Sequence, residues 1–278
     1  MSPFQFGVPG GLAARRSDPY GSTRTFVGAR HALLTSDGLV SAPPPGWRCP
    51  AFYTMISPAM GARFCQYHAD LGADGTGEGH TGGREWVLYV LAGGLTLSTG
   101  GKQGAVTGFA AGGSTPETAV LLTGGYAYLP PGTAYRLAAT EPGTGLLIFE
   151  KRYEPAPGVP PPAVLTGREA DVPGAPFLGD PAAMLQTLLP DRPEFDLAVN
   201  VFKYAPGATL PFVETHVMEH GLLMLAGEGI YRLEDRWYPV RAGDAIWMAP
   251  YCPQWFVATG KTPASYIYYK DVNRWPVC

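Results

Sequence analysis

Four side chains able to bind a metal ion fall at fixed offsets in the last third of the chain. Glu214 and His216 are two residues apart, His220 follows four residues later, and Gln254 comes after a proline-containing turn. Residues an even number apart on a β-strand point to one face, so we expect the first three to share a site. We expect Gln254 to begin a separate strand beside them. Two imidazoles, a carboxylate and an amide oxygen suit a divalent first-row ion and leave room for water or substrate.

The elements that must position these residues are short strands. Apolar or alternating segments recur between Gly and Pro turns, which predicts an all-β fold. The segments form two sets, at 51–56, 85–91, 95–99, 119–122, 127–129 and 145–149, and at 197–204, 220–225, 229–233, 236–240, 245–248 and 264–269. A proline-rich stretch, 153–193, separates the sets and predicts a linker with one short helix at 181–189. We therefore expect an N-terminal domain at 1–152, including an N-terminal extension, and a C-terminal domain at 194–278.

The two sets of strands resemble each other in sequence. Residues 85–93 parallel residues 219–227, and residues 124–135 parallel residues 243–254. In this alignment the first half keeps one good ligand out of four. The positions of Glu214, His216, His220 and Gln254 correspond to His80, Gly82, Trp86 and Tyr135. This pattern predicts an internal duplication with one working site.

Composition excludes several classes of function. The chain has 278 residues, 46% of them hydrophobic, and a net charge of −3 without a basic run, so nucleic acid is not an expected partner. No apolar stretch is long enough to span a membrane. Four cysteines without CxxC spacing predict reduced thiols. The first seven residues, Met1–Gly7, lack a basic region followed by an apolar one, so we expect a cytoplasmic protein.

The spacing resembles the two cupin motifs, G-x5-HxH-x3/4-E-x6-G and G-x5-P-x-G-x2-H, with informative departures. Glu214 stands where cupins usually have their first histidine, His220 where they have glutamate, and Gln254 where they have the final histidine. This exchanged set is similar to that of the (S)-ureidoglycine aminohydrolases. Further runs carry the same resemblance, namely 56–61, 214–221, 237–240, 246–250 and 269–274.

The resemblance implies a bicupin, with two antiparallel jelly-roll-type β-barrels. It implies a hydrolase that releases ammonia from (S)-ureidoglycine, giving (S)-ureidoglycolate in the allantoin branch of purine breakdown. The implied cofactor is Mn²⁺, held at Glu214, His216, His220 and Gln254. A homo-oligomer is expected because bicupins commonly assemble further. Plant relatives work in the endoplasmic reticulum, which is the alternative location if a signal segment precedes this sequence.

Residues around the metal would bind the substrate and move protons. Alternation places Tyr266 and Lys270 on one face of the last strand, where Lys270 can pair with a substrate carboxylate and Tyr266 with the ureido group. Glu214 can act as a proton shuttle and, with Gln254, contact the substrate. Tyr231 is a further candidate for the pocket wall. Glu219 has the opposite parity to His220 on a strand and is expected to face away.

Two other functions remain open on the sequence alone. One is a cupin dioxygenase or isomerase acting on a small polar acid, although such oxygenases favour a three-histidine iron site, which Gln254 disfavours. The other is a non-catalytic metal-binding or seed-storage bicupin. Storage proteins tend to have degraded ligand sets in both halves, whereas here one set is intact.

Overall fold

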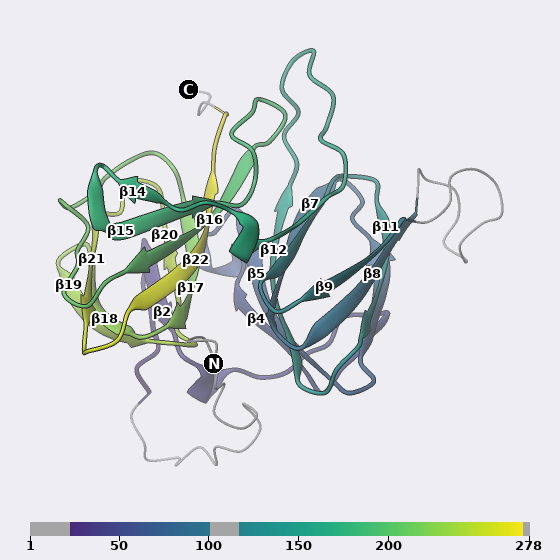
Figure 1. Ribbon diagram of the computed structural model, residues 1–278, viewed down its shortest axis with the longest axis horizontal. Helices are drawn as coiled ribbons and strands as arrows, with labels where there is room; N and C mark the ends of the chain where they lie inside the picture. The colour runs from purple at the N-terminus through teal and green to yellow at the C-terminus, as the bar shows by residue number, and fades with distance from the viewer. Residues whose placement is uncertain (1–22, 101–116, 275–278) are drawn as a thin grey trace.

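A computed structural model describes residues 23–100 and 117–274 (Figure 1). The predicted absence of a leader at Met1–Gly7 and the thiol of Cys278 lie outside the described residues. The described residues form four antiparallel sheets and no α-helix, which confirms the predicted all-β fold. Within the described part of the chain, no helix has the length and apolar content to cross a membrane. The three described cysteines, Cys49, Cys65 and Cys252, are free thiols.

The N-terminal half consists of a six-stranded sheet, ordered β13-β10-β7-β12-β5-β4, and a five-stranded sheet, ordered β3-β6-β11-β8-β9. The first sheet contains β4 (Ala51–Ile56), β5 (Phe64–Gly72), β7 (Arg84–Ala92), β10 (Gly125–Leu129), β12 (Thr144–Arg152) and β13 (Leu165–Arg168). The second contains β3 (Trp47–Arg48), β6 (Thr76–His80), β8 (Gly94–Gly100), β9 (Glu117–Leu122) and β11 (Ala134–Ala139).

The C-terminal half has an eight-stranded sheet, ordered β1-β2-β20-β17-β22-β16-β15-β14, and a three-stranded sheet, ordered β19-β18-β21. The larger sheet contains β1 (Phe26–Val27), β2 (His31–Leu34), β14 (Ala175–Phe177), β15 (Asp180–Thr187), β16 (Leu197–Tyr204), β17 (His220–Ala226), β20 (Ala245–Met248) and β22 (Ala264–Asp271). The smaller contains β18 (Glu228–Leu233), β19 (Arg236–Arg241) and β21 (Gln254–Thr259). Three short 3-10 turns complete the described elements, at Ser36–Gly38, Pro58–Met60 and Glu169–Asp171.

All twelve predicted strands are present, and the helix predicted at 181–189 is wrong. That segment forms β15, which pairs with β16 from Ala183 opposite Tyr204 to Thr187 opposite Asn200. Helix-forming residues such as Ala183 and Met184 favoured a helix, but the open edge of β16 supplies backbone partners and Ala183 is buried against the C-terminal core. Sheet pairing and burial therefore override the local preference.

Two segments join the halves more closely than the sequence predicts. Strand β2 extends the C-terminal sheet by pairing with β20, although it lies early in the chain. The segment 153–193 is not merely a connection, because β13 pairs with β10 while β14 and β15 extend the other half. The division at residues 152 and 194 stays a prediction about sequence organisation.

Three apolar cores hold the molecule together. One fills the space between the two sheets of the N-terminal half, and a second does the same in the C-terminal half. The third and largest lies between the six-stranded and eight-stranded sheets, where Phe64 and Phe149 of one half stack near Tyr269 of the other. The two halves are thus packed face to face through a continuous core rather than joined by a linker alone.

A buried charged cluster sits at the edge of this shared core. Lys151 on β12 forms an ion pair with Asp196 of the C-terminal half and lies 3.9 Å from Glu85 on β7. The Tyr128 hydroxyl donates to Glu85 Oε2 at 2.8 Å. Burial and the neighbouring Asp196 carboxylate raise the pKa of Glu85, because one ammonium cannot neutralise two buried carboxylates. The protonated form of Glu85 is therefore favoured.

We predict that Glu85→Gln makes stability less dependent on pH. The folded pKa of Glu85 lies above its unfolded pKa, so its contribution is full below the unfolded pKa and is lost as pH rises toward the folded value. The unfolding free energy of the variant minus that of the wild type should grow by up to about 1.4 kcal/mol per pH unit above about pH 5. Urea denaturation at several pH values measures this difference. A difference that stays constant with pH would contradict the assignment.

Candidate active site

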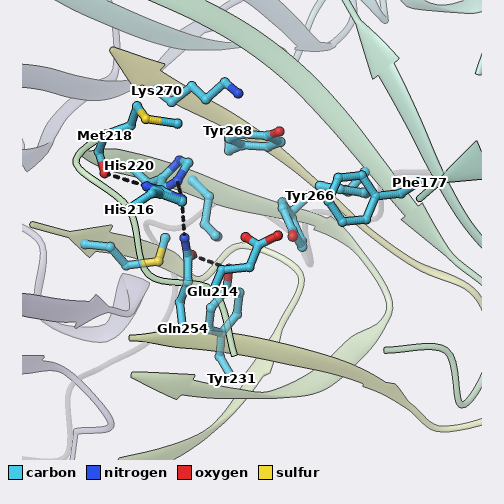
Figure 2. A pocket seen from close by; sticks show the side chains of 13 residues that line it. Phe177, Glu214, His216, Met218, His220, Tyr231, Gln254, Tyr266, Tyr268 and Lys270 are labelled. Atoms are coloured by element: carbon cyan, nitrogen blue, oxygen red, sulfur yellow. Dashed lines mark hydrogen bonds between the residues drawn. The ribbon is translucent and has the colours of Figure 1, made fainter. Parts of the chain in front are cut away.

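The predicted ligands lie around one cavity inside the C-terminal half, between its two sheets (Figure 2). The cavity has a volume of about 120 Å³, which suits a small molecule. Its lining residues come from both sheets, including the edge strand β14, and from the segment before β17. They are Phe177, Phe202, Glu214, His216, Met218, His220, Leu222, Tyr231, Met248, Gln254, Tyr266, Tyr268 and Lys270.

The segment that carries Glu214 and His216 is not the continuous strand that the sequence predicted. Glu214 forms an isolated bridge with Gln254, with backbone N–H···O distances of 2.8 and 3.0 Å, and regular pairing resumes only at His220. The parity argument is therefore wrong for His216, which lies in an irregular turn. Gln254 does begin a separate strand, β21, beside this segment as predicted.

A strained residue fixes this turn. Tyr251 has a φ of 60° and donates its backbone N–H to the His216 carbonyl at 2.8 Å. In the duplicated sequence it corresponds to Gly132, which has a φ of 80°. A tyrosine in this conformation costs on the order of 1–3 kcal/mol, and such strain persists where the surrounding structure holds it. Tyr251 thus adopts the left-handed backbone conformation that the second cupin motif usually gives to glycine.

The two histidines present their Nε2 atoms to each other at 3.0 Å. Their Nδ1 atoms face backbone carbonyls, His216 at 3.2 Å from Met218 O and His220 at 3.3 Å from Tyr269 O. With each Nδ1 proton directed at a carbonyl, both Nε2 atoms carry lone pairs. Two facing lone pairs repel unless a cation or proton lies between them, so this arrangement suits a shared metal ion.

The electrostatics of the pocket keep both imidazoles neutral. Burial lowers the pKa of His216, and the nearby Lys270 ammonium lowers it further, against an opposing hydrogen bond to Met218. Burial, the His216 ring and Lys270 together hold the pKa of His220 well below its ordinary value. Neutral imidazole is the form that binds metal ions, so these pKa shifts favour ligation at neutral pH.

Gln254 completes the convergent group. Its Nε2 is placed 3.1 Å from His216 Nε2, and its Oε1 accepts a hydrogen bond from the Tyr231 hydroxyl at 3.3 Å. A half-turn of the planar amide exchanges the positions of its oxygen and its nitrogen and leaves the rest of the side chain in place. Turned over, the same side chain would direct its oxygen at the histidines and its N–H₂ at Tyr231. The amide therefore fits as an oxygen ligand without moving its backbone.

Glu214 lies in the same cavity, but Figure 2 shows its carboxylate directed toward Tyr266 rather than toward the imidazoles. Burial raises the pKa of Glu214, and the Lys270 ammonium opposes this rise. Among the described residues, no three His, Cys, Asp or Glu side chains gather as a metal-holding group. The group that does converge is two histidines and an amide, with Glu214 across the pocket.

The alternation predicted for β22 is confirmed. Tyr266, Tyr268 and Lys270 all line the cavity, while Tyr269 points the other way into the core between the halves. Lys270 lies opposite His220 in the register of β17 and β22, and both side chains line the cavity. Tyr231 also lines the cavity from the opposite sheet.

Two predicted contrasts also hold in the structure. Glu219 faces away from the cavity, where its carboxylate accepts a hydrogen bond from Trp247 Nε1 at 2.8 Å. In the N-terminal half, Trp86 and Tyr135 are buried with ring centroids 4.8 Å apart, so aromatic rings occupy the positions of His220 and Gln254. His80 is exposed, and its Nδ1 accepts a hydrogen bond from Gly82 N.

Several lining residues were missed by the sequence analysis. Phe177 reaches the cavity from β14, within the predicted linker. Its ring packs against that of Phe202, with the ring centroids 4.9 Å apart. Met218 and Met248 add apolar walls, and Met248 lies opposite His31 of the N-terminal strand β2. Alternation could have indicated Met248, since it ends a predicted strand, but nothing local links Phe177 to a site about forty residues later.

The chain is similar in sequence to known proteins. Residues 200–269 match the model of the cupin domain family. The chain is 37% identical over 266 residues to a probable (S)-ureidoglycine aminohydrolase of Oryza sativa subsp. japonica, covering 95% of this chain and 80% of that protein. It is 35% identical over 259 residues to the (S)-ureidoglycine aminohydrolase of Arabidopsis thaliana, covering 92% of this chain and 80% of that protein.

The fold is also similar to that of a solved protein structure. The crystal structure of protein Ylba from Escherichia coli superimposes with a TM-score of 0.79 and 31% identity, covering 92% of this chain and 97% of that chain. The likeness in sequence and in fold therefore extends along nearly the whole chain. The chain is an enzyme of the cupin type that belongs to the (S)-ureidoglycine aminohydrolase family.

Proposed function

We propose that this enzyme hydrolyses (S)-ureidoglycine to (S)-ureidoglycolate and ammonia, a step in the breakdown of purines through allantoin. The observation that carries the proposal is the likeness, along nearly the whole chain, to relatives that bear this activity in their names. The small, partly polar cavity supports it, because the substrate is a small polar amino acid.

We propose further that Mn²⁺ binds at His216, His220, Gln254 and Glu214. The facing Nε2 atoms and the adjacent amide support this set, and their mixed nitrogen and oxygen donors suit a fairly hard divalent ion. Glu214 would supply the remaining protein ligand, since its backbone bridge to Gln254 holds it at the cavity. A bound Mn²⁺ would act as a Lewis acid that polarises substrate groups and lowers the pKa of water.

The remaining polar residues would orient the substrate. Lys270 lines the cavity, and its ammonium group can form an ion pair with the α-carboxylate of the substrate. Tyr266 can hydrogen-bond the ureido group, and Tyr231 can do so where it is not engaged with Gln254. Burial raises the pKa of both tyrosines, which keeps their hydroxyls protonated as donors.

Proton transfer is assigned to Glu214. Hydrolysis forms a bond from water oxygen to the α-carbon and breaks the bond to the amine, so a proton from water must reach the leaving nitrogen. Glu214 is the carboxylate among the lining residues of the cavity, so it is the group placed to accept that proton and release it to the leaving nitrogen. Its place in the cavity, across from Lys270, puts it beside the substrate rather than beside the bulk solvent.

We predict that His216→Ala abolishes both metal retention and activity. The change removes one of the two facing imidazoles, and the remaining His220, Gln254 and Glu214, which lies across the pocket, make a weaker site for a divalent ion. Metal content after gel filtration and the rate of (S)-ureidoglycolate formation are the measurements. His80→Ala is the matched control, because His80 occupies a ligand position in the half without a site and should leave both unchanged. A His216→Ala enzyme that keeps its metal would refute the proposed site.

We predict that Lys270→Met weakens substrate binding but leaves bound Mn²⁺ in place. A hydrogen-bonded ion pair with a charged group contributes about 1.5–3 kcal/mol, so KM should rise by about 10- to 100-fold. Steady-state kinetics and metal content measured on the same sample separate the two effects. Loss of metal with this substitution would mean that Lys270 supports the ligands and does not bind substrate.

A further inference from the structure

The two halves contain equivalent buried glutamates that the proposed reaction does not use. Glu85 and Glu219 stand at matching positions of the duplicated sequence, and both have an exposed fraction of 0%. Each accepts a hydrogen bond of 2.8 Å from a ring at a matching position, Tyr128 for Glu85 and Trp247 for Glu219. The duplication has therefore kept a glutamate–aromatic pair in each half.

Each glutamate lies beside an ion pair that joins a residue of its own half to a residue of the other half, and the signs of the two charges are reversed between the two clusters. Lys151, which lies opposite Glu85 in the sheet, pairs with Asp196 of the C-terminal half. In the other half the corresponding strand carries Asp271, which pairs with Arg63 of the N-terminal half at 2.8 Å. Each half thus sends one charged residue to the other's cluster.

Only one of the two clusters adjoins the cavity. Glu219 directly precedes His220, and Asp271 directly follows Lys270, while His220 and Lys270 lie opposite each other in β17 and β22. The cluster of Glu85 adjoins Trp86, which is part of the apolar core between the two sheets of the N-terminal half. The same arrangement thus flanks a site in one half and a packed core in the other.

Arg63 contacts both residues that flank the site. Its Nε lies 3.3 Å from Glu219 Oε2, and its backbone N–H faces both Glu219 oxygens at 3.1 and 3.2 Å. Its terminal nitrogen donates to Asp271 Oδ2 at 2.8 Å. Asp271 Oδ1 in turn accepts the Glu219 backbone N–H at 2.5 Å. One guanidinium therefore ties the start of β17 to the end of β22.

We propose that Arg63 is a positioning residue, through which the N-terminal half holds His220 and Lys270 at the spacing that the site requires. The inference rests on the proposed function, in which His220 binds metal and Lys270 binds the substrate carboxylate. It gives the half without a site a defined role in the reaction.

Because Arg63 is half exposed, its guanidinium can be removed to test its effect on the site with little effect on the stability of the fold. Its side chain is 53% exposed, so solvent weakens its ion pairs with Asp271 and with the buried Glu219. Arg63→Ala also keeps the backbone N–H that faces Glu219, so the buried carboxylate retains this donor and Trp247. The guanidinium can therefore be removed without exposing the core between the halves.

The test measures Mn²⁺ affinity and steady-state kinetics of Arg63→Ala in the full-length protein. Mn²⁺ binding is followed by the EPR signal of the free ion. We expect about tenfold weaker Mn²⁺ binding, as for residues that orient a metal ligand, and a higher KM, with little change in Tm. Arg63→Lys should recover part of the loss, and added guanidinium ion should recover part of it in Arg63→Ala.

Tyr128→Phe is the matched control, because it removes a donor to the equivalent glutamate beside the packed core. It should lower Tm and leave Mn²⁺ affinity and KM unchanged. Arg63→Ala with wild-type Mn²⁺ affinity and KM would overturn the positioning role while leaving the proposed function intact. A wild-type protein that binds no Mn²⁺ would overturn both.

Discussion

The pairing of β17 with β22 is the constraint on which the rest of the structure depends. In this register His220 lies opposite Lys270, so a candidate metal ligand and a candidate substrate anchor face one cavity. Because side chains alternate along a strand, the neighbouring Glu219 and Tyr269 face the other half of the molecule. A slip by one residue would exchange the cavity residues with those of the shared core.

The duplicated fold has been used in two ways. In the N-terminal half, Trp86 and Tyr135 take the positions that correspond to His220 and Gln254 and complete an apolar core. In the C-terminal half, the same positions carry His220 and Gln254, which leave space and polar atoms in the interior. Polar groups inside a barrel cost stability unless they are partnered. The core between the halves and the ion pairs across it stabilise the half that contains the cavity.

Much of the fold and the membership of the site could be predicted from the sequence, because both follow from periodicity and spacing. Alternation placed Tyr266, Tyr268 and Lys270 correctly, and the motif spacing brought Glu214, His216, His220 and Gln254 to one cavity. The path of residues 214–219 was not predictable, since a backbone bridge and the strained Tyr251 replace a regular strand. Phe177, Arg63 and Asp196 act through contacts far apart in the chain, which no local pattern records. The false helix at 181–189 failed for the same reason.

The most direct test is the chirality of ureidoglycolate formed from ureidoglycine generated in solution, with and without added Mn²⁺. Ureidoglycine carries two nitrogens on one carbon and can lose ammonia unaided, so release of ammonia alone does not identify an enzyme. The proposed function predicts an excess of the (S) product that depends on Mn²⁺ and on His216. A racemic product formed at the uncatalysed rate would contradict it.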